Sequence, residues 1–125
     1  MIPVGPNEVG ISRRAIYLRS RLEAASGGDS AEFLLVSDAP GAAVAGEMRE
    51  LSRKGFSCYF LTERLGKGGS LRNAVPLASG DVIVLMDADV DLDPGIIWRM
   101  ARYVSAGGAA MAIARRVSRP HGALR

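Results

Sequence analysis

Cysteine and histidine are almost absent from this chain, which has one of each among its 125 residues. With Cys58 alone, no disulfide can form within the chain, so the sequence fits a reducing compartment. Cys58 stands in an apolar segment, where we expect a small buried residue of a strand. His121 lies in a polar tail, so we expect a surface residue and not a catalytic one.

Long apolar runs are also missing. No run approaches the roughly 20 residues that span a bilayer, and the N-terminal residues lack the apolar core of a signal peptide. We therefore expect a soluble, cytoplasmic protein, for which peripheral contact with a membrane surface stays open.

Lysine is scarce as well, because 14 of the 16 basic residues are arginine. The net charge is +3, and arginines are frequent near the C-terminus. A basic end of this kind fits phosphate or nucleic acid, but the chain has no basic stripe interleaved with aromatic residues and no nucleic-acid-binding motif. We expect no nucleic-acid partner and interpret residues 117–125 as a solvated basic tail.

The chain does have a regular alternation of apolar runs and helical apolar faces, within a length that suits a single domain, residues 1–125. Pro76 should kink or split the third helix. The alternation predicts an α/β fold of three layers, α/β/α and Rossmann-like, with a mainly parallel sheet covered by helices on both faces. The expected strands cover residues 1–4, 33–36, 56–61, 81–86 and 109–114, and the expected helical faces cover residues 11–22, 44–51, 71–78 and 97–104.

The fourth expected strand ends in a run of alternating carboxylates. Residues 82–86 are apolar and read as a buried parallel strand, and Asp87, Asp89 and Asp91 follow. Side chains alternate along an extended chain, so these three carboxylates share one side. They repel one another unless a cation lies among them, and Mg²⁺ or Mn²⁺ prefers oxygen ligands of this kind.

The end of this loop has a simpler interpretation. Asp93 followed by Pro94 is typical of a helix N-cap and the first helical position. Aspartates also crowd such loops only because they cap and turn the backbone, and this interpretation stays open for the first two aspartates of the run. An EF-hand calcium loop is excluded, because Leu92 takes its glycine position and Trp98 its glutamate position.

Three loops are expected to meet. Right-handed crossovers place the carboxyl ends of parallel strands at one edge of the sheet. The loops that hold Glu8, Asp38 and residues 87–91 would therefore lie together, at the edge where open α/β sheets bind ligands. This convergence predicts a metal-assisted phosphate or diphosphate site.

Five segments, in this order and at suitable spacing, resemble one family: residues 2–8, 34–38, 65–74, 79–89 and 113–116. They are similar to the opening strand and turn, the second strand with its aspartate, the Gly-Lys-Gly loop, the Asp-x-Asp strand and a strand ending in arginine. The family is the family 2 glycosyltransferases with the GT-A fold, of the dolichol-phosphate-mannose synthase kind. The resemblance runs to about Arg116 and concerns the nucleotide-sugar-binding half, so we expect a truncated GT-A domain.

The resemblance implies a metal site and a nucleotide-sugar site. Asp89 would be the first ligand of Mg²⁺ or Mn²⁺ and Asp91 the second, while Asp87 would bind the metal or the ribose. The residues implied at the nucleotide-sugar are Pro3, Glu8, Asp38, Lys67, Asp87, Arg115 and Arg116.

Several of these roles have alternatives. Asp38 would accept a hydrogen bond from the base, or cap a turn. Lys67 would meet phosphate or base, or be a solvated turn lysine. Glu8 would contact the base or cap the first helix. Arg115 or Arg116 would face the diphosphate.

The reaction implied by the resemblance moves a sugar from a UDP- or GDP-sugar to an acceptor, a polyprenyl phosphate or a glycan. The catalytic base of relatives lies in an acceptor-binding half, and Asp29 and Glu47 have no motif context for that role. An alternative is a non-catalytic or split binding module that needs a partner subunit or a second copy. A nucleotidyltransferase ranks third, because residues 4–8 lack a glycine-rich loop with arginine and lysine.

Overall fold

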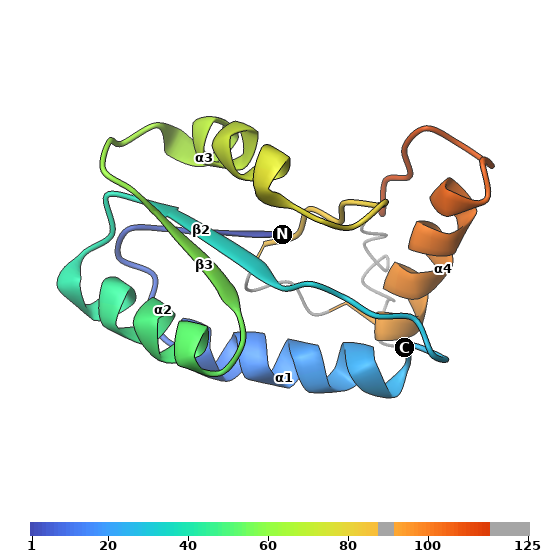
Figure 1. Cartoon of the computed structure of the whole chain (residues 1–125), viewed down its shortest axis with the longest axis horizontal. Helices are drawn as coiled ribbons and strands as arrows, with labels where there is room; N and C mark the ends of the chain where they lie inside the picture. The colour runs from blue at the N-terminus through green and yellow to red at the C-terminus, as the bar shows by residue number, and fades with distance from the viewer. Residues whose placement is uncertain (88–91, 116–125) are drawn as a thin grey trace, which may run out of the picture.

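The computed structural model describes residues 1–87 and 92–115. Within them, three strands form a parallel sheet in the order β1-β2-β3. Helices α1 and α2 cover one face of this sheet and α3 covers the other, which confirms the expected α/β architecture (Figure 1). The elements are β1 (Ile2–Val4), α1 (Ile11–Ala24), β2 (Leu34–Asp38), α2 (Ala42–Arg53), β3 (Ser57–Leu61), α3 (Gly66–Ala74), the 3₁₀ helix η1 (Val75–Leu77) and α4 (Pro94–Ser105).

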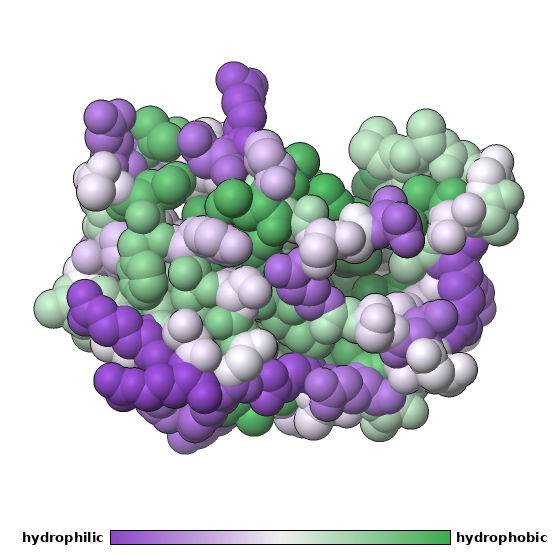
Figure 2. Space-filling model, viewed as in Figure 1, coloured by the Kyte–Doolittle hydropathy of each residue, from purple (hydrophilic) through white to green (hydrophobic). Residues whose placement is uncertain are grey.

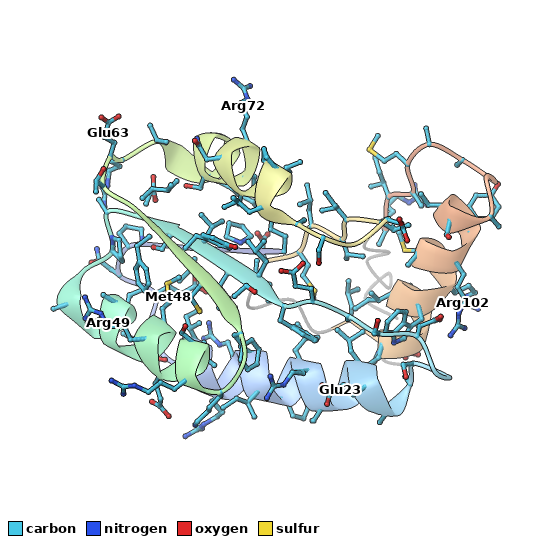
Figure 3. All side chains as sticks on the ribbon, in the orientation of Figure 1. Glu23, Met48, Arg49, Glu63, Arg72 and Arg102 are labelled. Carbon is cyan, nitrogen blue, oxygen red and sulfur yellow. The ribbon has the colours of Figure 1, made fainter. Side chains whose placement is uncertain are left out.

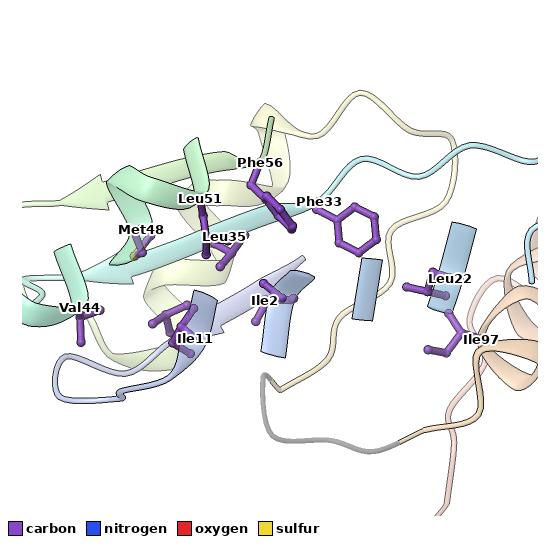
Figure 4. Close-up of a cluster of buried hydrophobic side chains, with 12 residues drawn as sticks. Ile2, Ile11, Leu22, Phe33, Leu35, Val44, Met48, Leu51, Phe56 and Ile97 are labelled. Carbon is purple, nitrogen blue, oxygen red and sulfur yellow. The ribbon is translucent and has the colours of Figure 1, made fainter. Parts of the chain in front are cut away.

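The central strand β2 holds the two layers of side chains together. All five of its residues are buried, as expected for an apolar run between two parallel neighbours. Leu35 packs into a cluster with α1 and α2, and Leu34 and Val36 pack on the opposite face with Ala74 of α3. The larger cluster is drawn in Figure 4 and consists of Ile2, Val4, Ile11, Ala15, Leu22, Phe33, Leu35, Val44, Met48, Leu51, Phe56 and Ile97.

The helices follow the apolar periodicity of the sequence. Ile11, Ala15 and Leu22 are buried along α1, as the spacing predicts. In α2, Met48 points into the interior, while hydrophilic side chains lie on the outer sides of α1 and α2 (Figures 2 and 3). Pro76 falls in η1, so the expected split of the third helix is confirmed. None of the described helices is long and apolar enough to cross a membrane.

The expected strand over residues 81–86 is not formed. The Met1 nitrogen donates to the Val84 carbonyl at 2.7 Å and the Met86 N–H donates to the Met1 carbonyl at 3.2 Å, which is the pattern of one position of a parallel ladder. Along a strand, the N–H and C=O groups of successive residues point to opposite sides. On the side of β1 that faces the segment 81–86, Met1 is therefore followed by Pro3. Proline has no N–H to donate to the Met86 carbonyl, so this bond of the next ladder position cannot form.

The expected strand over residues 109–114 is also wrong, because the structure has no strand there. A strand needs a paired neighbour, and the segment 81–86, its expected neighbour, is itself unpaired after one position. Met111 and Ile113 are left 71% and 78% exposed. A cavity of about 710 Å³ lies beside the segment 81–86 and is also lined by residues of α1 and α4.

Helix α4 is attached to the C-terminal end of α1 by polar contacts. The Trp98 Nε1–H donates to the Leu22 carbonyl at 2.8 Å. Arg102 forms an ion pair with Asp29 at 2.8 Å and donates to the Ser26 carbonyl at 2.6 Å. The Asp93 side chain accepts the Gly95 N–H at 2.8 Å, so the predicted N-cap is confirmed.

The N-terminal end of α1 is capped from another helix. The Glu47 carboxylate of α2 accepts the Gly10 N–H and the Ser12 N–H, both at 2.9 Å. These bonds lower the pKa of Glu47 below its ordinary value of 4.5, and the bond from the Ser12 N–H has the largest effect. Glu47 therefore has a structural task, and Glu8 is not the cap of this helix.

We expect the Glu47→Gln variant to lose about 1 kcal/mol of unfolding free energy at pH 7, because one charged cap is removed. Because the pKa of Glu47 is lower in the folded state, its ionised carboxylate stabilises the fold above pH 4.5. This stabilisation is lost as the pH falls through the pKa of the folded state. The variant should therefore lose less stability than the wild type between pH 5 and pH 3. Urea denaturation at both pH values measures this.

The control is Glu50→Gln on the same helix, where the carboxylate forms an exposed ion pair with Lys54. Such pairs contribute little, so this variant should stay within about 0.5 kcal/mol of the wild type. Equal losses in the two variants at both pH values would contradict the capping role of Glu47.

Candidate functional site

A cleft of about 590 Å³ opens at the carboxyl edge of the sheet, where the sequence predicts a site. It lies between the loop after β1, the end of β2, the first turn of α3 and the end of the segment 81–86. Five predicted nucleotide-sugar residues are brought together here. The lining residues are Pro3, Val4, Gly5, Pro6, Glu8, Asp38, Arg64, Gly66, Lys67, Ser70 and Asp87.

The loop after β1 is fixed by its own contacts. The Glu8 carboxylate accepts the Gly5 N–H at 3.0 Å and pairs with Arg14 at 3.3 Å. The Gly41 N–H donates to the Pro6 carbonyl at 2.9 Å, and a Cβ at Gly41 would lie only 3.2 Å from that oxygen. The loops after β1 and β2 are therefore held close together, and glycine allows the approach.

Asp38 joins the end of β2 to the start of α3. Its side chain is buried, and its Oδ2 accepts the Gly66 N–H at 2.6 Å. Gly66 has a φ of 69°, a left-handed conformation that favours glycine. No other described residue donates a hydrogen bond to this carboxylate. Asp38 thus supports the cleft, and its predicted contact with a nucleotide base stays a prediction.

Lys67 and Asp87 pair across the cleft. The Lys67 ammonium contacts the Asp87 Oδ1, and the two side chains are 61% and 49% exposed. An ion pair this exposed contributes little to stability. Its significance is positional, because a cationic group lies against the first carboxylate of the Asp-rich run.

The remaining predicted residues are not part of the described cleft. Asp89, Asp91 and Arg116 lie outside the described residues. Arg115 is exposed and does not line the cleft. Within residues 1–87 and 92–115, no group of three His, Cys, Asp or Glu side chains is placed to hold a metal ion.

The sequence model of the family described as Glycosyl transferase family 2 matches residues 15–124. The chain belongs to glycosyl transferase family 2. It is a glycosyltransferase domain of the GT-A type, and the α/β arrangement of the sheet and helices agrees with this. Members act on a nucleotide-sugar donor and an acceptor, and commonly use a divalent metal ion. No curated protein and no solved structure was found to match the chain.

The match begins within α1, so Pro3 and Glu8 lie outside the matched range, and their place in the cleft comes from the structure alone. Lys67 and Asp87 lie inside it, as does Asp38. Of the five predicted residues in the cleft, these three lie within the range of the family match.

Sequence reasoning missed some residues of this cleft. Arg64 and Pro6 line it, although neither is among the residues that the sequence predicts for the site. Ser70 carried no signal at all. It lines the cleft while only 2% exposed, and a single serine in a helix does not reveal its burial in the sequence.

We expect Gly66→Ala to lower the unfolding free energy by about 1 kcal/mol, because an L-residue is strained at this φ and the N–H would turn from Asp38. Gly68→Ala is the matched control in the same helix, with open space around the added Cβ. It should stabilise the protein by roughly 0.5–1 kcal/mol through helix propensity. Chemical denaturation gives both values, and the same sign for both variants would contradict the role of Gly66.

Proposed function

We propose that the cleft binds a UDP- or GDP-sugar together with Mg²⁺ or Mn²⁺, and that the sugar passes to an acceptor such as a polyprenyl phosphate or a glycan. The observation that carries the proposal is the meeting of Asp38, Lys67 and Asp87 in one cleft of a family 2 chain. Each group suits a different part of a nucleotide-sugar.

The cleft supplies cations for the diphosphate. Lys67 and Arg64 both line it and carry exposed cationic groups. Ammonium and guanidinium groups bind phosphate oxygens by charge-assisted hydrogen bonds. Lys67 is already near the reacting end of the site, because its partner Asp87 begins the Asp-rich run.

The residues at this end fit a divalent ion. Asp87, Asp89 and Asp91 would hold it through carboxylate oxygens, the ligand type that Mg²⁺ and Mn²⁺ prefer. The Lys67–Asp87 pair supports this assignment, since a cation already balances the first carboxylate. When bound, the ion supplies Lewis-acid stabilisation of the leaving nucleoside diphosphate.

A binding module without turnover is the second candidate, and one observation favours it. The two carboxylates considered for the catalytic base have structural partners: Asp29 pairs with Arg102, and Glu47 caps α1. A sugar-transfer or donor-hydrolysis assay on the purified chain separates the two candidates. Steady turnover that disappears in Asp87→Asn supports the transferase, and tight binding without turnover supports the module.

We expect UDP or GDP to raise the melting temperature in the presence of Mn²⁺ and not with EDTA. Nucleotide at 100 times its dissociation constant should add about 2.7 kcal/mol to stability. The Asp87→Asn variant should bind the same nucleotide at least about tenfold more weakly, since a charged ligand group is lost. Asp81→Asn, an equal charge change outside the cleft, is the control. Equal behaviour of the two variants would refute the site.

We expect Lys67→Met to change metal and nucleotide binding in opposite directions. Mn²⁺ alone should bind about two- to fivefold more tightly, because Asp87 no longer has an ammonium to displace. Nucleotide with Mn²⁺ should bind more weakly, because a phosphate contact is lost. Arg64→Met is the control and should weaken only the nucleotide. Titration calorimetry measures the Mn²⁺ affinity and the nucleotide affinity. Weaker Mn²⁺ binding in Lys67→Met would contradict the idea that the metal displaces the Lys67 ammonium from Asp87.

A further inference from the structure

The hydroxyl of Ser70 is buried in the cleft without a partner. Ser70 lies on α3 one turn after Lys67, is 2% exposed and lines the cleft. Its Oγ forms no hydrogen bond with any described residue. A helical serine can bond to the carbonyl four residues back, here that of Gly66, and this one does not. A buried hydroxyl left unpaired is unfavourable, and because Ser70 lines the cleft, a ligand there is its candidate partner.

The surroundings of Ser70 indicate which part of a ligand it meets. Pro3 and Val4 give the cleft an apolar wall, and Asp38 is a buried carboxylate of the same cleft. The charged side chains of Lys67 and Asp87 are largely exposed, at the mouth. The cleft is therefore graded, with the exposed ion pair of Lys67 and Asp87 at the mouth and the Ser70 hydroxyl and the Asp38 carboxylate in its buried part.

A phosphate group suits the mouth better than the buried part. In the buried part it would lose its hydration and face the Asp38 carboxylate, without a cation beside it. A flat, neutral heterocycle suits the buried part, because its ring covers the apolar wall and its polar edge meets groups that donate and accept. A serine hydroxyl can donate a hydrogen bond and also accept one.

We propose that Ser70 is a specificity-determining residue that hydrogen-bonds the nucleobase of the donor, next to Asp38, while the diphosphate lies at Lys67 and Asp87. This inference rests on the proposed function of the cleft and deepens it, since it assigns the base end of the ligand.

The test compares Ser70→Ala with Ser37→Ala. Ser37 is the matched control, because its hydroxyl is also buried and unpaired but does not line the cleft. The probes are UDP, GDP and pyrophosphate, each with Mn²⁺, in titration calorimetry with the whole chain. Ser70→Ala should weaken the preferred nucleotide about tenfold, or 1.4 kcal/mol, and leave pyrophosphate binding unchanged. Ser37→Ala should leave the binding of all three probes unchanged.

The stability of the free protein gives a second readout. Removing an unpaired buried hydroxyl should raise the melting temperature of Ser70→Ala by about 2–4 °C, so that the affinity falls while the stability rises. A structural defect would lower both. Ser70→Cys keeps the volume and a weak donor, and should bind the nucleotide with intermediate affinity.

Three results would overturn the inference. Unchanged nucleotide affinity in Ser70→Ala, with a wild type that binds, refutes the role of Ser70 and leaves the proposed function intact. An equal loss for pyrophosphate shows that Ser70 serves the phosphates and not the base. A wild-type chain that is folded and binds neither nucleotide nor pyrophosphate refutes the proposed function itself.

Discussion

The hydrogen bond from the Gly66 N–H to the Asp38 carboxylate determines the shape of the cleft. It joins the end of the central strand to the start of α3, although 28 positions separate the two residues. With this bond in place, the first turn of α3 faces the carboxyl edge of the sheet, and Lys67 and Ser70 reach the cleft from one helix. Gly66 makes this bond with a φ of 69°, a conformation that favours glycine, so the backbone conformation and the polar contact occur at the same residue.

The secondary structure was predictable where the local pattern and the tertiary packing agree. Helices α1 and α2 have one apolar face each, and α4 begins at an Asp-Pro pair that leaves few alternatives. The segments 81–86 and 109–114 have the composition of strands, but a strand exists only with a paired neighbour. Pro3 removes the donor that the first segment needs, and Ile83 and Leu85 of that segment are exposed. Composition alone does not reveal such a long-range mismatch.

The site was predictable as a place and less so as a set of contacts. Strand ends locate it, because topology brings the loops after parallel strands together. The rotation of α3 was only partly predictable. Its apolar residues suggest a buried face of Leu71, Ala74, Val75 and Ala78, but of these only Ala74 is buried, and Ser70 is buried beside it. A buried serine contradicts the apolar pattern. Such local contradictions are expected at functional positions, where a ligand completes what the chain leaves unpaired.

Some carboxylates of the described chain stabilise junctions between elements, and others line the cleft. Glu47 caps α1, Asp29 holds Arg102 of α4, and Glu32 accepts the Ser79 N–H and hydroxyl, so each stabilises a junction between elements. Asp38 and Asp87 face the cleft instead. Under the proposed function, the cleft residues would bind the donor, whereas the three junction carboxylates already have structural partners. The proposal of donor binding therefore depends on other residues than a proposal of sugar transfer would, and donor binding can be tested independently of transfer.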